Sequence, residues 1–145
     1  NSLMSFNGQL GKLSDAKGLH SFFVNDTDVA SLKIDNPLIG TGITGGYDYV
    51  NNDLFMTFKQ VSKPSFTISF NESINEFVSY YDFIPSLYIS KGFNFLTTTS
   101  NNLSIYKQYA GNYNTFYGIV YPSYVTLNVN PASETDCIFN NQNYT

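Results

Sequence analysis

Few side chains in this 145-residue sequence have the chemistry that catalysis uses, and they lie far apart along the chain. His20 is the one histidine and Cys137 the one cysteine. A nucleophilic side chain needs an adjacent base, but His20 falls in a predicted helix beside phenylalanines, and Cys137 has no convincing base partner. We interpret His20 as a surface or core-edge residue and Cys137 as a small buried apolar residue.

The segment Asn-Asp-Thr-Asp at residues 25–28 has oxygen-bearing side chains at alternate positions, as a calcium loop does. The glycine and the bidentate glutamate of an EF-hand loop are missing from it. We interpret the segment as the solvated end of a helix.

Asp48 and Asp82 each follow a tyrosine within an apolar segment. A carboxylate pair for glycoside hydrolysis needs a fixed separation and a raised pKa on one member. Glutamate is scarce and tryptophan absent, so the other parts of such a site are not evident. We expect both aspartates to accept backbone N–H groups at a strand end or turn. No catalytic, cofactor-binding or metal-binding residue is assigned, and we do not expect an enzyme.

Tyrosines are the other abundant group with binding chemistry. Their alternating placement favours packing between strands, and a lectin-like platform that stacks sugar rings is the alternative. The tyrosines concerned are Tyr80, Tyr81, Tyr88, Tyr106, Tyr109, Tyr113, Tyr117, Tyr121 and Tyr124. The Asn-x-Ser/Thr sequons at Asn25, Asn71, Asn102 and Asn143 are interpreted as chance matches in an asparagine-rich chain.

The sequence pattern of residues 67–131 predicts the strands that position these side chains. Apolar and polar residues alternate at period two, and Asn, Gly, Pro and Ser clusters interrupt them, as in consecutive antiparallel hairpins. The predicted strand pairs are residues 47–50 with 54–59, 66–70 with 77–83, 93–98 with 104–108, and 115–121 with 124–129. Such a series suits part of a β-propeller, with a β-sandwich as the alternative.

Residues 1–45 form a helix and loop lead-in to the predicted β region at residues 46–145. Ser14 has the side chain of an N-cap, so a single short helix is predicted at residues 14–23. Residues 29–34 read as an edge strand. A last strand near residues 136–140 has no partner left in the chain, and the opening lacks an initiator methionine or signal peptide, so we expect an excerpt of a longer polypeptide.

In the predicted strand at residues 77–83, alternation assigns Phe77, Tyr81 and Phe83 to one face, directed into the core. Val78, Tyr80 and Asp82 then belong to the opposite face.

Composition excludes several classes of protein. Charged residues make up 12% of the chain, all seven cationic residues are lysine, and the net charge is −4, which argues against a dedicated nucleic-acid reader. One cysteine cannot form an intrachain disulfide. No apolar run reaches the ~18 residues of a membrane span.

Several motifs resemble a family pattern in their order and spacing. They are Asp-Ala-Lys-Gly-Leu at 15–19, Asp-Asn-Pro at 35–37, Gly-Gly-Tyr-Asp at 45–48, Phe-Asn-Glu at 70–72, Val-Ser-Tyr-Tyr-Asp-Phe-Ile-Pro at 78–85, Phe-Tyr-Gly at 116–118 and Asn-Val-Asn-Pro at 128–131. Together they resemble the tail muzzle, or nozzle, proteins of crAss-like short-tailed phages. The sequence departs from that pattern at Phe77, where a tryptophan is expected, and before Leu103, where a glycine is expected.

This resemblance implies a structural virion component of a phage tail, with a β-propeller domain. It implies a ring of identical copies that lines or supports the DNA exit channel, in contact with other tail or hub proteins and active in DNA ejection. We expect DNA to pass such a ring without tight binding, since few cations contact its phosphates. The alternative hypothesis is a carbohydrate-binding β module of a surface or secreted protein.

Overall fold

The computed structural model describes residues 2–33, 36, 40–102 and 104–125. Its elements are β1 (Met4–Phe6), β2 (Leu10–Lys12), α1 (Leu13–Ala16), α2 (His20–Asp26), α3 (Val29–Leu32), β3 (Gly42–Asp48), β4 (Asp53–Lys59), β5 (Phe66–Asn71), β6 (Glu76–Tyr81), β7 (Leu87–Lys91), β8 (Asn94–Thr98), β9 (Ile105–Lys107), β10 (Thr115–Phe116) and β11 (Ile119–Val120). The prediction of a mainly β protein built from antiparallel hairpins is confirmed.

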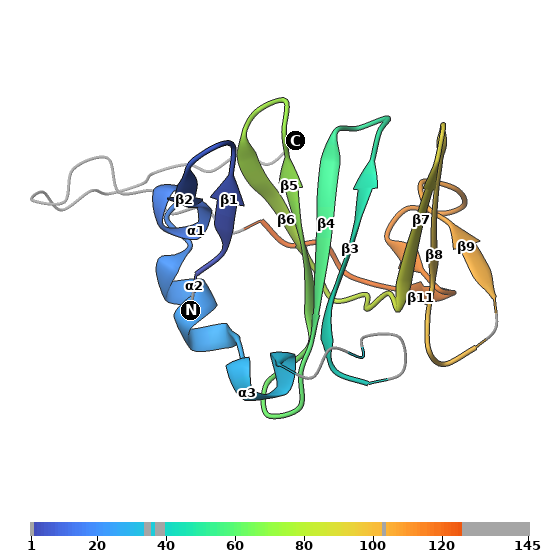
Figure 1. The fold of residues 1–145 in the computed structure, drawn as a ribbon. Helices are drawn as coiled ribbons and strands as arrows, with labels where there is room; N and C mark the ends of the chain where they lie inside the picture. The colour runs from blue at the N-terminus through green and yellow to red at the C-terminus, as the bar shows by residue number, and fades with distance from the viewer. Residues whose placement is uncertain (1, 34–35, 37–39, 103, 126–145) are drawn as a thin grey trace, which may run out of the picture.

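The central layer is a four-stranded antiparallel sheet in the order β3-β4-β5-β6 (Figure 1). The first two predicted hairpins are therefore confirmed. Asn52 and Asn75 lie in their turns with φ of 58° and 57°, a left-handed backbone that asparagine tolerates better than most residues. Sequential strands joined by such short turns can pair only with their neighbours along the chain, which produces the observed meander.

A β-bulge in β6 changes which side chains share a face. Ser69 lies opposite Ser79, whereas Phe70 lies opposite Phe77, so Val78 has no cross-strand partner. One extra residue reverses the alternation beyond it. Phe77 consequently packs against one apolar cluster and Tyr81 against another. The prediction that Phe77, Tyr81 and Phe83 share one face is wrong.

The N-terminal helices cover one face of the central sheet (Figure 1). Phe22 packs edge-on against Phe66 and Tyr80, with ring centroids 5.1 and 5.9 Å apart, and Phe66 stacks on Tyr80 at 5.5 Å. The buried residues of this first cluster are Phe23, Met56, Phe58, Phe66, Ile68 and Phe70. Tyr80 thus faces the helices, which the bulge makes possible.

The lead-in differs from the prediction in two places. Gly18, with φ of 73°, ends a first short helix, so α1 and α2 replace the single helix expected at residues 14–23. Ser14 does not cap a helix; it is fully buried, and its Oγ accepts the Leu3 backbone N–H at 3.1 Å. Residues 29–32 form helix α3 where a strand was expected, because Asp28 caps their free N–H groups.

The opposite face of the central sheet carries a second apolar cluster. A three-stranded sheet, β7-β8-β9, contributes Tyr88 and Phe95 to it, and Phe55 and Phe83 complete its buried core. The predicted pairing of residues 93–98 with 104–108 is confirmed as β8 with β9, but β7, which the sequence reading missed, is the partner on the other side of β8.

A small hairpin of β10 and β11 follows. Tyr117 and Gly118 form its turn, with φ of 56° and 82°, a left-handed pair typical of a type I′ turn. The expected partner strand at residues 124–129 is wrong for Tyr124 and Val125, which lie outside any strand. The rest of that strand, the strand near residues 136–140 and Cys137 lie outside the described residues.

Among the described residues, no helix has the length and apolar character needed to cross a bilayer. The assignment of these sheets to a propeller or a sandwich stays a prediction, as does a boundary between residues 1–45 and 46–145.

Candidate functional site

The structure places Asp48 at the end of β3, where its side chain is 2% exposed. One carboxylate oxygen accepts the Val50 N–H at 3.0 Å, and the other accepts the Asn51 amide at 2.6 Å. The predicted role of Asp48, accepting a backbone N–H at a turn, is confirmed. Asp82 lies exposed after β6.

His20 is exposed at the start of α2, and its Nδ1 lies 2.8 Å from Asp15 Oδ1. The hydrogen bond with His20 lowers the pKa of the Asp15 carboxyl, and the nearby histidine and Lys12 charges act in the same direction. This hydrogen bond joins the two short helices at the molecular surface. The surface interpretation of His20 is confirmed.

Asp28 organises a polar junction between the helices and the turn that follows β4. Its carboxylate accepts the Ala30, Ser31 and Ser62 backbone N–H groups, and hydrogen bonds from Ser31 and Ser62 lower its pKa to about 2. Its own N–H donates to Gln60 Oε1 at 2.5 Å. These bonds occupy the carboxylate in a helix cap. Within the described residues, no His, Cys, Asp and Glu side chains gather in a group of three or more that could hold a metal.

Two of the family-like motifs meet at the turn end of the central sheet. Tyr47 Oη donates to Glu72 Oε2 at 2.8 Å, and Asn71 Nδ2 donates to Asp53 Oδ1 at 2.7 Å. The Glu72 N–H also bonds the Asn52 carbonyl at 2.9 Å. The motifs at residues 45–48 and 70–72 therefore bind one turn to the other, which is a structural role.

Gly46, in the first of these motifs, lets the two sheets approach closely. A Cβ at this position would lie 2.3 Å from the Cβ of Tyr88. Ser90 Oγ reinforces the contact by donating to the Tyr47 carbonyl at 2.5 Å. The glycine is thus required where strand β7 crosses β3.

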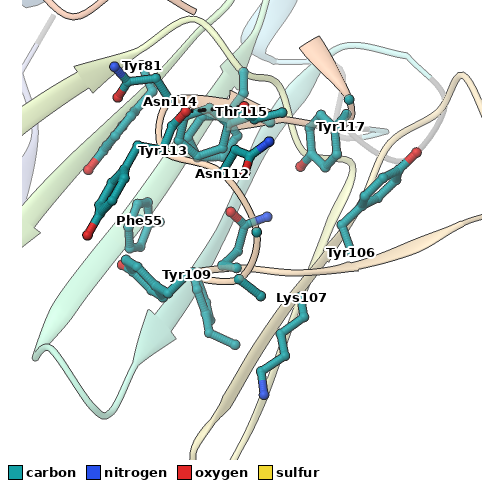
Figure 2. Close-up of a pocket in the computed structure, with 17 residues that line it drawn as sticks. Phe55, Tyr81, Tyr106, Lys107, Tyr109, Asn112, Tyr113, Asn114, Thr115 and Tyr117 are labelled. Atoms are coloured by element: carbon teal, nitrogen blue, oxygen red, sulfur yellow. Dashed lines mark hydrogen bonds between the residues drawn. The ribbon is translucent and has the colours of Figure 1, made fainter. Parts of the chain in front are cut away.

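Among the described residues, a cavity of about 680 Å³ lies between the two sheets and the segment at residues 107–118 (Figure 2). Phe55, Phe83 and Phe95 form its apolar floor, and these side chains are 3–4% exposed. Ligand sites commonly have volumes of ~300–1,000 Å³ and apolar walls with a few polar groups. The cavity meets that description.

Left-handed residues shape the wall at residues 107–118. Tyr109, Asn114 and Tyr117 have φ between 55° and 57°, and Gly111 and Gly118 are also left-handed. A non-glycine residue held there costs on the order of 1–3 kcal/mol, and such strain is concentrated at functional sites. Here the left-handed residues turn the segment back over the cavity.

Hydrogen bonds to Thr97 fix this wall to β8. Gln108 Nε2 donates to Thr97 Oγ1 at 2.6 Å, and Tyr117 Oη donates to the same oxygen at 2.9 Å. Burial raises the pKa of Tyr117 to about 12, so its phenol keeps the proton that it donates. Phe116 stacks on Phe83 with ring centroids 4.2 Å apart.

The tyrosines divide between packing and exposure. Tyr88 is 8% exposed, and its hydroxyl lies 2.6 Å from Thr57 Oγ1 in the core, as the packing interpretation predicts. Tyr81, Tyr106 and Tyr117 are partly covered at the cavity. Tyr109 and Tyr113 also line it but are 66% and 98% exposed. Tyr124, which does not line it, is 84% exposed.

Sequence reasoning did not find this cavity, because its walls come from strands and a loop that are distant in the chain. A local signal was nevertheless present in residues 109–118, where tyrosines alternate with glycine and asparagine. Such a composition indicates left-handed turns that hold aromatic rings near the surface.

Comparison of the amino-acid sequence with known proteins identifies the family of this chain. The chain matches the Crassvirus muzzle protein family over residues 1–101, and it belongs to that family. It is 29% identical over 143 residues to the muzzle protein of Bacteroides phage crAss001. No solved structure matches the chain. The resemblance to crAss-like phage muzzle proteins is confirmed, and the chain is a structural component of the virion tail.

The match to the phage crAss001 protein covers 97% of this chain and 10% of that relative. The chain thus corresponds to a small part of the relative's length.

Proposed function

We propose that this chain contributes to a ring of identical copies that lines or supports the DNA exit channel of the tail. Membership of the muzzle protein family is the observation that carries the proposal. The meander β3-β4-β5-β6 has the four antiparallel strands of a propeller blade, and β7-β8-β9 supplies strands of a second. In this proposal the two sheets are neighbouring blades.

The placement of lysines supports passage of DNA without tight binding. Lys17 pairs with Glu76 at 3.0 Å, and Lys12 lies 3.7 Å from Asp15. Lys59 is 7% exposed and donates to Ser86 Oγ. Affinity for DNA grows with the number of phosphates that free cations neutralise. With a net charge of −4 and no arginine, this surface offers few such contacts.

The outer edge of β6 supports assembly through strands. In the described part of the chain β6 pairs only with β5, and Val78 and Tyr80 are 48% and 51% exposed beside that edge. An unpaired strand edge with apolar side chains is a surface that another strand or subunit covers. We assign it to contact between copies or with other tail proteins.

Native mass spectrometry of the protein with Val78→Lys tests the assembly. The proposal predicts a closed ring for the unaltered protein and smaller species for the variant, because a desolvated lysine opposes contact. Val61→Lys, on a 76% exposed side chain outside any strand, is the matched control and should leave the ring intact. A monomeric unaltered protein, or electron microscopy of virions that places the chain away from the tail channel, contradicts the proposal.

A further inference from the structure

The cavity between the two sheets has a lining whose composition is not explained by packing of the sheets alone. Nine of its 17 lining residues are aromatic, and Lys107 is the one that carries a charge. The floor belongs to the second apolar cluster, but the mouth stays open to solvent. An occupant must therefore present an apolar face and be uncharged or nearly so.

Polar groups at the mouth are free to bind a ligand. Among the described residues, neither the Asn112 side-chain amide nor the Tyr113 hydroxyl has a hydrogen-bond partner. The neighbouring Asn114 already uses its Oδ1, which accepts Ser123 Oγ at 3.0 Å. Asn112 offers both donors and an acceptor, and Tyr113 one of each.

The rings of Tyr109 and Tyr113 lie on either side of Phe55 in the view of Figure 2. They project from the strained segment and stay 66% and 98% exposed, although an aromatic ring gains most from burial. Partial burial raises the pKa of the Tyr109 phenol, and its interaction with the Asp48 carboxylate raises it further, so this hydroxyl is directed at Asp48 and the ring is the part left for a ligand.

We propose that this cavity is a carbohydrate-binding site that takes one ring of a neutral glycan. The C–H face of a pyranose packs on the exposed tyrosine rings, and the Asn112 amide and the Tyr113 hydroxyl exchange hydrogen bonds with its hydroxyl groups. The absence of arginine and the single lining lysine disfavour phosphorylated or sulfated sugars, which need several cations. The site goes beyond the ring function and does not depend on it.

Single-stranded nucleic acid also stacks on aromatic rings, but its binding combines them with a positively charged groove. Here one lysine lines the cavity, and the buried carboxylate of Asp48 acts on Tyr109 at its edge. A phosphate backbone would meet almost no compensating charge. The neutral glycan is therefore the better fit.

Saturation-transfer NMR on the full chain tests the site with the methyl glycosides of glucose, galactose, mannose and N-acetylglucosamine as probes. We expect transfer to the ring protons of at least one probe, with millimolar affinity. Tyr113→Ala should weaken binding of that probe by about tenfold, since one aromatic stacking contact is lost. Because Tyr113 is almost wholly exposed, the variant should keep the wild-type melting temperature.

Tyr124→Ala removes a ring that is also largely exposed, at 84%, but lies outside the cavity, and this variant should bind like the wild type. Asn112→Ala should also weaken binding, whereas Asn101→Ala, on an exposed residue outside the cavity, should not. The proposal is overturned if no glycoside receives transfer, or if Tyr113→Ala and Tyr124→Ala reduce it equally. Binding of oligothymidylate that Tyr113→Ala abolishes, without glycoside binding, would also overturn it and assign the cavity to nucleic acid.

Discussion

Several single residues in this protein fix how its strands and turns contact one another. Gly46 leaves room for strand β7 to pack closely against β3. Asp48 and Asn71 form hydrogen bonds that stabilise turns, and Thr97 accepts two hydrogen bonds from the cavity wall. The carboxylates of Asp48 and Asp28 are thus occupied by turn formation and helix capping. The hydrogen bonds that these carboxylates accept stabilise the turn and the helix start.

Replacement of Gly46 by alanine should destabilise the fold by about 1–3 kcal/mol, the usual cost of overpacking. The added methyl would lie 2.3 Å from the Tyr88 Cβ, which is attached to the β7 backbone and cannot rotate away. Urea denaturation followed by circular dichroism measures the loss. Gly11→Ala is the control, because its methyl meets only Ser5 Oγ at 3.4 Å. Equal midpoints for the two variants would contradict the close approach.

Asp28 should make stability depend on acid pH. Its pKa is about 2 in the folded chain against 3.8 ordinarily, so the unfolded chain binds the proton more readily. The stabilisation is then fully present above about pH 4 and is lost as the pH falls towards 2. Asp28→Asn should lower the melting temperature at pH 6, and the gap to wild type should close at pH 2.

Thermal melts by circular dichroism between pH 2 and 6 provide the measurement for Asp28. Asp82→Asn removes the same charge from an exposed site and controls for the change in net charge. A gap between Asp28→Asn and wild type that stays constant over this range would show that the capping bonds do not depend on ionisation.

At the scale of elements, the period-two alternation was sufficient to predict the central hairpins and the β8–β9 pair. It failed at β6 because a bulge is one inserted residue, and Val78 has no side-chain feature that marks it. It failed at residues 29–32 because local capping by Asp28 outweighed the β-branched residue at the start. The cavity was missed for a related reason, since its floor and its wall meet only through tertiary packing.

Truncation of Phe83 should show how much the second cluster contributes. The ring is 3% exposed and stacks on Phe116, so Phe83→Ala should cost about 3–5 kcal/mol. Phe93→Ala is the matched control, because that ring is 91% exposed and should change stability by less than about 0.5 kcal/mol. Denaturant midpoints decide the outcome. A small effect at Phe83 would mean that the two sheets are held together elsewhere.

At the scale of the whole molecule, the helices, the central sheet and the three-stranded sheet form successive layers with an aromatic cluster on each side of the central sheet (Figure 1). Such packing needs few charges, and charged residues make up 12% of the chain. Asparagine, serine and threonine supply uncharged polar side chains, while the scarcity of cations limits attraction to phosphates. In the proposed tail ring, this balance would let DNA pass without being held.

Fluorescence anisotropy with a duplex oligonucleotide should therefore show no saturation by this chain up to about 100 µM at ~150 mM salt, the weak end of non-specific binding. A variant with Val61→Arg, Phe93→Arg and Asn101→Arg adds three cations at exposed positions and should bind measurably. Its log affinity should fall with log salt at a slope of about −0.9 for each phosphate contacted. The matched variant Val61→Gln, Phe93→Gln and Asn101→Gln alters the same sites without charge and should resemble the unaltered chain. Micromolar binding by the unaltered chain would mean that it binds DNA tightly. The proposal that DNA passes this surface without tight binding would then be wrong.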